Sequence, residues 1–231
     1  MKVFENTIKT VAIFSDDNNH RVLLRKTWDD DLKKAAFLMI FPASNDVSVT
    51  DLTTILVLNG LAKLGGYGSV DILNCFSKIN ANLSHKSESF NISENDEQIL
   101  QSAMECDTII IGWGTGGEGN KRIRARQMAI LKLLEPYKEK IQATVDGRGK
   151  TCQHVLTPSL RSRFGITPFE FPKLTIANDG KPEETDKEPP DDDSEEQAEA
   201  ETDESPSDVP QTDEPEKQSK NKRSKKDAQP A

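Results

Sequence analysis

The segment with the most evident chemical potential is IIIGWGTGGEGNKRIRARQMAILKLL, residues 109–134. An apolar run leads into a glycine-rich loop, and a helical pattern with several cations in its first turns begins near Asn120. The unpaired N–H groups of a helix start attract anions, and glycines let the backbone approach a ligand closely. The segment therefore predicts an anion site made of Gly114, Gly116, Gly117, Gly119, Lys121, Arg122 and Arg124. The alternative is a flexible turn followed by a solvated helix face.

Known phosphate loops do not fit this segment. The pattern G-x-G-x-x-G fits in two overlapping registers, and it follows the third buried strand of the chain instead of the first. A P-loop is interrupted because Asn120 precedes Lys121, and Arg122 stands where Ser or Thr would hold magnesium. The loop thus argues against a nicotinamide or flavin site and against a P-loop NTPase, and no cofactor is expected.

The elements that would position this loop follow from the hydrophobic pattern. Residues 10–15 and 20–28 flank DDNN and predict a β-hairpin. Continuous apolar runs at 35–41, 69–76 and 108–114 are typical of buried strands, and a weaker fourth strand at 150–154 ends near His154. Because helical patterns separate these strands, the sequence predicts a three-layer α/β/α domain with a mainly parallel four-stranded sheet plus the N-terminal β-hairpin.

Three helices are expected between the strands. The first begins at about Thr50, the second opens at Ser93 as its capping residue, and the third starts near Asn120. For the first helix, the spacing of the leucines and isoleucines indicates one inward face made of Leu52, Ile55, Leu56, Leu58 and Leu61. In open α/β sheets ligands bind beyond the carboxyl ends of the strands, so the site is expected at that edge.

The last quarter of the chain has a different composition. No aromatic residue follows Phe171, and residues 175–231 are dense in Asp, Glu, Pro and Ser. Such a segment buries too little apolar surface to offset an ordering entropy of roughly 1–2 kcal/mol per residue. The sequence predicts a single α/β domain at 1–174 and a disordered acidic tail with a basic end at 175–231.

The charge of the chain belongs to this tail. The whole chain carries a net charge of -9, whereas the tail alone holds 19 acidic and 8 basic residues, which leaves 22 basic and 20 acidic residues for the domain. A slightly basic domain is compatible with a nucleic acid or nucleotide partner. The tail is a solubilising tether, a basic hook for nucleic acid, or an acidic mimic for a basic site, and composition does not identify its partner.

Several other classes of chemistry are disfavoured. The three cysteines, Cys75, Cys106 and Cys152, lie far apart and form neither a zinc motif nor a disulfide framework. The motifs G-x-S-x-G and H-E-x-x-H are absent, so no metal site or hydrolase elbow is expected. Without a signal peptide or a long apolar run, the chain is predicted to be cytoplasmic and to have no membrane partner.

The order of short motifs resembles the bacterial and phage proteins of the domain of unknown function 1643. That family has an R-x-L-x-R-x-x-W start, a strand ending in N-P-S, a D-x-T, a G-Y-G, an Asn after the next strand, an N-D pair, a W-G and a late H-P-L. The counterparts here are Arg21, Leu23, Arg25 and Trp28, then Pro42 and Ser44, Asp51 and Thr53, Gly66 to Gly68, Asn74, Asn95 and Asp96, Trp113 and Gly114, and His154. Phe41 and Val155 depart from the family pattern, which has Asn and Pro there.

A fainter likeness is to the uracil-DNA glycosylase superfamily, which has similar loops after its strands. The likeness implies a pocket in which Asp46 orients water, Asn74 reads a base edge and His154 stabilises the departing base. Phe41, Tyr67 and Trp113 are the candidates for stacking on the base.

Each of these residues also has a structural explanation. Asp46 and Asn74 are of types that close turns, while His154 and Trp113 are of types that pack at strand ends. Two functions therefore stand: a domain that binds or acts on a nucleobase, nucleotide or nucleic acid, or a non-catalytic interaction protein of bacterial or phage origin that uses its charged tail. The sequence leaves open whether the protein is an enzyme.

Overall fold

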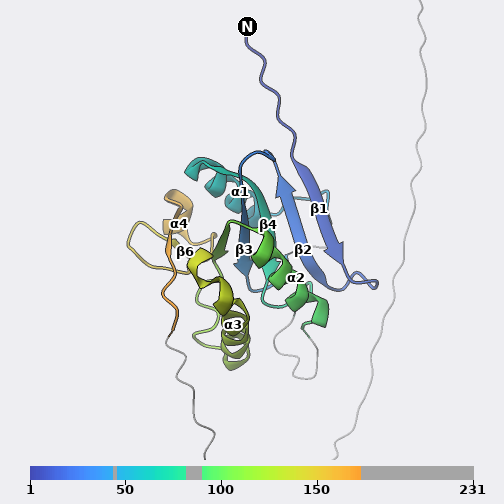
Figure 1. Cartoon of the computed structure of the whole chain (residues 1–231), viewed down its shortest axis with the longest axis vertical. Coiled ribbons are helices and arrows are strands. Elements are labelled where there is room, and N and C mark those ends of the chain that lie inside the picture. Colours follow the sequence, from blue (N-terminus) through green and yellow to red (C-terminus); the bar gives the residue numbers. More distant parts are fainter. Residues whose placement is uncertain (44–45, 82–89, 173–231) are drawn as a thin grey trace, which may run out of the picture. The chain divides into compact units, whose positions relative to one another are not determined.

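The computed structural model describes residues 1–43, 46–81 and 90–172 (Figure 1). The predicted tail at 175–231 lies outside the described residues. The strands are β1 (Lys9–Phe14), β2 (Arg21–Thr27), β3 (Lys33–Met39), β4 (Tyr67–Asn74), β5 (Thr108–Ile111), β6 (Ile141–Val145) and β7 (Gly165–Pro168). The helices are α1 (Leu52–Leu64), α2 (Ser93–Glu105), α3 (Lys121–Leu134), the 3₁₀ helix η1 (Glu135–Lys140) and α4 (Pro158–Ser162).

The strands form one seven-stranded sheet in the order β1-β2-β4-β3-β5-β6-β7. Strands β4, β3, β5 and β6 are parallel to one another, whereas β1, β2 and β7 join by antiparallel pairing. The predicted hairpin is present as β1 and β2. The prediction of a mainly parallel four-stranded sheet was wrong, because the hairpin extends the sheet through β2 on β4 and β7 adds an antiparallel strand on β6. The sheet is mixed.

The fourth parallel strand lies at Ile141–Val145 and not at the predicted 150–154. Ile141 and Ala143 are buried there, and β6 pairs with β5 in register. Residues 150–154 instead turn back along β6: the Cys152 N–H donates to the Thr144 carbonyl, and Thr151 forms an isolated bridge with Val145.

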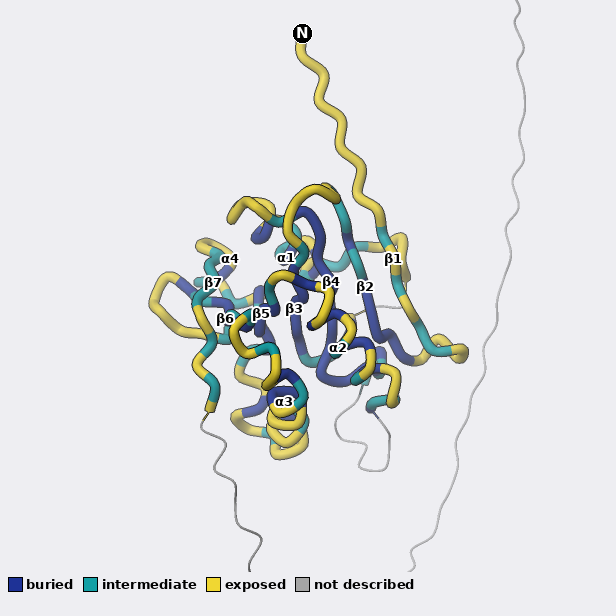
Figure 2. The backbone as a smooth tube through the Cα atoms, viewed as in Figure 1, coloured by how far each residue is buried: buried dark blue, intermediate teal, exposed yellow. Residues whose placement is uncertain are grey.

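Helices cover both faces of the sheet, which confirms the three-layer arrangement. One core joins α2 and α3 to the sheet through residues such as Leu38, Ile99 and Ile130. The other core joins α1 and α4 through residues such as Phe37, Leu61 and Leu160. Figure 2 shows the buried central strands between the helices, whose outer surfaces are exposed. The ends of the parallel strands are therefore places where polar groups of the sheet can meet a ligand.

The helix starts agree with two of the three predictions. Asp51 caps α1 by accepting from the Thr54 N–H, and Asn120 caps α3 by accepting from the Ile123 N–H. The prediction for Ser93 was wrong, because Ser93 lies inside α2 and the helix has no side-chain cap.

The inward face of α1 also differs from the prediction. Val57 and Leu61 are buried, whereas Leu52 and Ile55 are 53% and 40% exposed. Gly60 explains the shift, because a Cβ there would lie 2.7 Å from the Phe164 ring, so the helix turns its glycine toward that ring. Apolar residues are thereby left on the outer side of α1.

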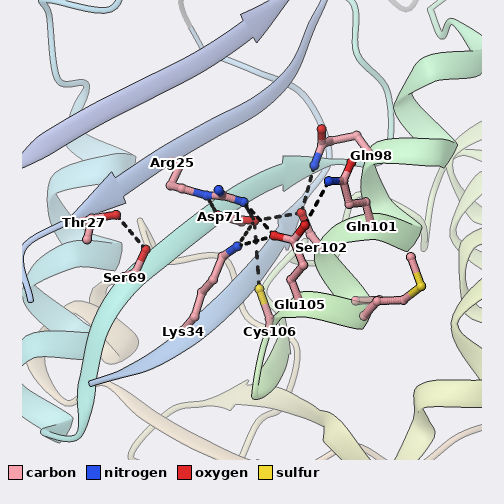
Figure 3. Close-up of polar contacts among 12 residues, drawn as sticks. Arg25, Thr27, Lys34, Ser69, Asp71, Gln98, Gln101, Ser102, Glu105 and Cys106 are labelled. Carbon is pink, nitrogen blue, oxygen red and sulfur yellow. Dashed lines mark hydrogen bonds and ion pairs between the residues drawn. The ribbon is translucent and has the colours of Figure 1, made fainter. Parts of the chain in front are cut away.

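A buried ionic network ties the hairpin to the parallel strands on the α2 face (Figure 3). The Asp71 carboxylate on β4 is fully buried and accepts hydrogen bonds from Arg25 on β2 and from Ser102 on α2. Lys34 on β3 completes an ion pair with Asp71 at 3.2 Å, and Glu105 bonds both cations at the solvent side. This network fixes the mutual position of three strands and the end of α2.

Candidate functional site

The three residues that the sequence singled out for catalysis, Asp46, Asn74 and His154, lie at or after the carboxyl ends of parallel strands. The chain leaves β3, β4, β5 and β6 at this edge, because all four strands run in the same direction. Asn74 is the last residue of β4 and pairs with Met39, the last residue of β3. Asp46 lies in the segment that follows β3, and His154 lies beyond the turn that follows β6.

Asn74 has a buried side chain with an unused donor. The residue is 1% exposed, and its Nδ2 atom has no hydrogen-bond partner among the described residues. The backbone carbonyl of Asn74 accepts from Asn95 Nδ2 at 3.1 Å, so Asn95 holds the main chain at this point. The Oδ1 atom of Asn95 also lacks a hydrogen-bond partner within the described part of the chain. An unsatisfied buried donor costs about 1–3 kcal/mol, and such groups in native proteins need an explanation.

His154 is held as a neutral imidazole. Its Nδ1 atom accepts from the Leu156 N–H at 3.3 Å, which leaves the proton of the neutral ring on Nε2. Burial lowers the pKa of His154 below its ordinary value of 6.5, and the charge of Asp51 offsets part of this effect. The Nε2–H group is therefore a neutral hydrogen-bond donor near neutral pH.

Gly114 allows this placement of His154. It has a φ of +71°, and a Cβ there would lie 3.0 Å from the Cβ of His154. The loop after β5 thus packs against the segment that carries the histidine. This contact joins two of the predicted site segments at the same edge.

The lowered pKa of His154 predicts a pH effect on stability. Between 6.5 and the lower folded value the unfolded chain binds more protons than the folded one, so stability falls as the pH drops through this window. His154→Gln should reduce the difference between the free energies of unfolding at pH 7.5 and pH 5.5, measured by chemical denaturation. An identical difference in both proteins would contradict the assignment of a buried neutral imidazole.

A charge cluster at the start of α1 was missed at the level of sequence. The Asp51 carboxylate accepts hydrogen bonds from Thr54. Burial lowers the pKa of the side chains of Arg21, Lys26 and His154, and the negative charge of Asp51 offsets part of this lowering. Arg21 and Lys26 are each 4% exposed. The available signal was the R-x-L-x-R and D-x-T motifs, but nothing in their spacing indicates that β2 and the start of α1 meet.

Asp46 occupies a more open position than the other two candidates. It is exposed, and its Oδ1 atom accepts from the Ser48 N–H at 2.8 Å. This bond closes a turn in the manner common for Asp in loops. Asp46 follows β3 at the edge of the sheet where β4 ends with Asn74, and its side chain is exposed to solvent.

The glycine loop surrounds a small cavity of about 240 Å³ between the segments after β5 and β6. Trp113, Gly114, Gly117 and Gln153 are among its lining residues. Two of the glycines are explained by packing: a Cβ at Gly116 would meet Ile40 at 2.6 Å, and one at Gly117 would meet Gln127 at 2.0 Å. Gly119 has open space in the direction of a Cβ.

The cations that follow the loop have different partners. Arg124 donates to the carbonyls of Gly117 and Glu118, so its guanidinium closes the loop on itself. Arg122 lies over the Phe90 ring at 4.0 Å from the centroid. Lys121 is exposed in the first turn of α3. Anion binding at this loop stays a prediction, with Lys121 the predicted cation least engaged with the fold.

The three stacking candidates lie in different places. The ring of Phe41 stacks on Phe76 with centroids 5.0 Å apart, and Trp113 is 8% exposed and lines the loop cavity. Tyr67 begins β4 and donates to Thr108 Oγ1, so it lies at the amino edge of the sheet, opposite to Asn74. Tyr67 therefore cannot contribute to a pocket at the carboxyl edge, and this candidate was wrong.

Asp146 is a second carboxylate that sequence reasoning missed. It follows the true strand β6, is 6% exposed, and accepts from Ser159 Oγ and from the N–H groups of Arg148 and Lys150. The Ser159 bond is the main cause that lowers its pKa. Because three donors already bond its carboxylate, Asp146 closes the turn after β6.

The cysteines do not supply a nucleophile. Burial raises the pKa of the Cys75 and Cys106 thiols to about 12 and also raises that of Cys152. Among the residues described, no cluster of three or more His, Cys, Asp or Glu side chains has a metal-binding arrangement. Within the same part of the chain, none of the helices combines the length and apolar character that crossing a membrane requires.

The fold and this edge define an α/β protein with a mixed sheet and a polar cluster beyond its parallel strands. The family model described as "Protein of unknown function (DUF1643)" matches residues 21–156, more than half of the chain, and the chain belongs to this family. The match begins at Arg21 and extends past His154, so it contains the whole candidate site. Comparisons with curated proteins and with solved structures found no match.

Proposed function

We propose that the domain binds a nucleobase or nucleotide at the carboxyl edge of its sheet. The observation that carries the proposal is the buried Nδ2 group of Asn74, which has no partner among the described residues. A ligand acceptor would satisfy this donor, and the exocyclic oxygens of bases are such acceptors. A site built to hydrogen-bond a ligand discriminates strongly, because its buried polar groups stay unpaired with the wrong one.

The chemistry of His154 supports the same ligand class. Its neutral Nε2–H group is a second donor, suited to an oxygen that gains negative charge. If a base departs from its sugar, this donor stabilises the departing anion, while Asp46 lies on the solvent side where water enters. Phe41 and Trp113 supply aromatic surface at this edge.

The glycine loop adds a place for phosphate. Lys121 and the start of α3 lie beside it, and Gly119 leaves the backbone accessible. A nucleotide should therefore bind more tightly than its nucleoside, with a difference that shrinks as salt increases.

A binding panel tests the proposal. Bases, nucleosides, nucleotides and short single-stranded and duplex DNA are titrated into the full chain by calorimetry. We expect at least one class to bind, and Asn74→Ala to weaken it by tenfold or more because the donor is lost. Asn59→Ala is the matched control, since this exposed asparagine lies on α1 away from the sheet edge, and it should leave the affinity unchanged.

Two outcomes would contradict the proposal. The absence of binding by every member of the panel would favour the non-catalytic interaction protein. Equal affinity for Asn74→Ala and the wild type would show that the ligand does not use this amide.

A further inference from the structure

A second cavity lies on the α1 face of the hairpin, between β1, β2 and the outer surface of α1. Its volume is about 510 Å³, within the range of roughly 300–1,000 Å³ that is typical of small-molecule sites. Ile8, Val47, Ile55 and Leu58 form aliphatic walls. Ile8 and Ile55 are 50% and 40% exposed, so these walls are open to solvent and to a ligand.

A buried ammonium group faces this cavity. Lys26 on β2 is 4% exposed, and its Nζ atom donates to Thr10 Oγ1 at 2.8 Å and to Thr50 Oγ1 at 3.3 Å. All three residues line the cavity, so the ammonium lies between two hydroxyl groups of the cavity wall. Two of its three protons are used, and one stays available for a ligand.

The ammonium has no ion-pair partner in the described part of the chain. Asp51 acts on it only at longer range, and Arg21 is a nearby like charge. Burial of a charged group without a bonded counter-ion is unfavourable. A bound anion would supply that counter-ion, and the two threonine hydroxyls can donate to its second oxygen because each accepts from Lys26 and keeps its own proton.

We propose that this cavity binds a small aliphatic carboxylic acid, with its carboxylate on Lys26, Thr10 and Thr50 and its hydrocarbon chain against the aliphatic walls. Asn74 and His154 are not among the residues that line this cavity, whereas its wall residues Val47 and Ser48 directly follow Asp46, and the Ser48 N–H donates to Asp46 Oδ1. The apolar walls favour a hydrocarbon over a sugar, and the ammonium favours an acid over an alcohol.

The test compares octanoate with octan-1-ol and octylamine, titrated into the full chain by calorimetry. Octanoate should bind one to one and at least tenfold more tightly than octan-1-ol, because only the acid pairs with Lys26. Octylamine should show no binding. Lys26→Met, of similar length and without the charge, should remove the preference for the acid, and circular dichroism checks that this variant folds.

A second variant tests the cavity independently of the charge. Ile55→Trp adds bulk at an exposed wall position and should weaken octanoate at least tenfold. Asn74→Leu should leave octanoate affinity unchanged, which separates this site from the nucleobase site. Equal binding of acid and alcohol, an undiminished preference in Lys26→Met, or unchanged octanoate affinity in Ile55→Trp would overturn the proposal.

Discussion

Asp71→Ala should lower the free energy of unfolding by about 3–5 kcal/mol, the cost expected when one partner of a buried ion pair is removed. The carboxylate is fully buried, and it receives two bonds from Arg25 at 2.6 and 2.9 Å and one from Ser102 at 2.8 Å. Without it, the cations of Arg25 and Lys34 remain beside each other at the junction of three strands. Chemical denaturation measures the loss.

Glu105→Gln is the control within the same network. Glu105 bonds the same two cations, but its side chain is 41% exposed, so water replaces much of what the charge contributes. We expect a loss of less than about 1 kcal/mol for this variant. Comparable losses for the two substitutions would show that burial does not set the energy of this network.

Besides the hairpin, the strands that the sequence predicted correctly are those with continuous apolar runs. Residues 35–41, 69–76 and 108–114 overlap β3, β4 and β5, because a strand buried on both faces is mostly apolar. Strand β6 was missed since its buried face includes Thr144. That hydroxyl is satisfied by the carbonyls of Ile111 and Gln153, contacts between segments that are distant in the sequence.

The inward face of α1 was not predictable from periodicity. Apolar residues surround this helix, so several faces are nearly equivalent in pattern. The choice depends on Phe164, which packs where Gly60 has no side chain. The exposed Ile55 and the partly buried Leu58 then form walls of the Lys26 cavity.

The candidate site stays a prediction, and only part of its geometry follows from the sequence. Asn74 follows from the rule that ligands bind beyond the carboxyl ends of parallel strands, because it ends β4. His154 was instead predicted at the end of a strand that the fold places at Ile141–Val145. The roles of the cations depend on contacts that only the fold creates: Arg122 lies on Phe90, and Arg126 pairs with Asp96 of α2. The same run of basic residues after a glycine loop is compatible with anion binding and with contacts inside the fold.

Asn74→Leu should raise the stability of the ligand-free protein and remove nucleobase binding. Leucine has a similar branched shape, and it replaces a buried donor that has no partner in the described structure. Relief of that donor should add about 1–3 kcal/mol to the free energy of unfolding. An amide that served the fold would give the opposite sign, because its loss would remove stabilising hydrogen bonds.

The most direct measurement is therefore the free energy of unfolding of the wild type and Asn74→Leu, each with and without the tightest ligand from the binding panel. The wild type should gain stability with ligand by mass action, whereas Asn74→Leu should be more stable without ligand and gain nothing from it. An Asn74→Leu protein that is less stable than the wild type, or that is stabilised by the ligand to the same degree, would contradict a nucleobase site at Asn74.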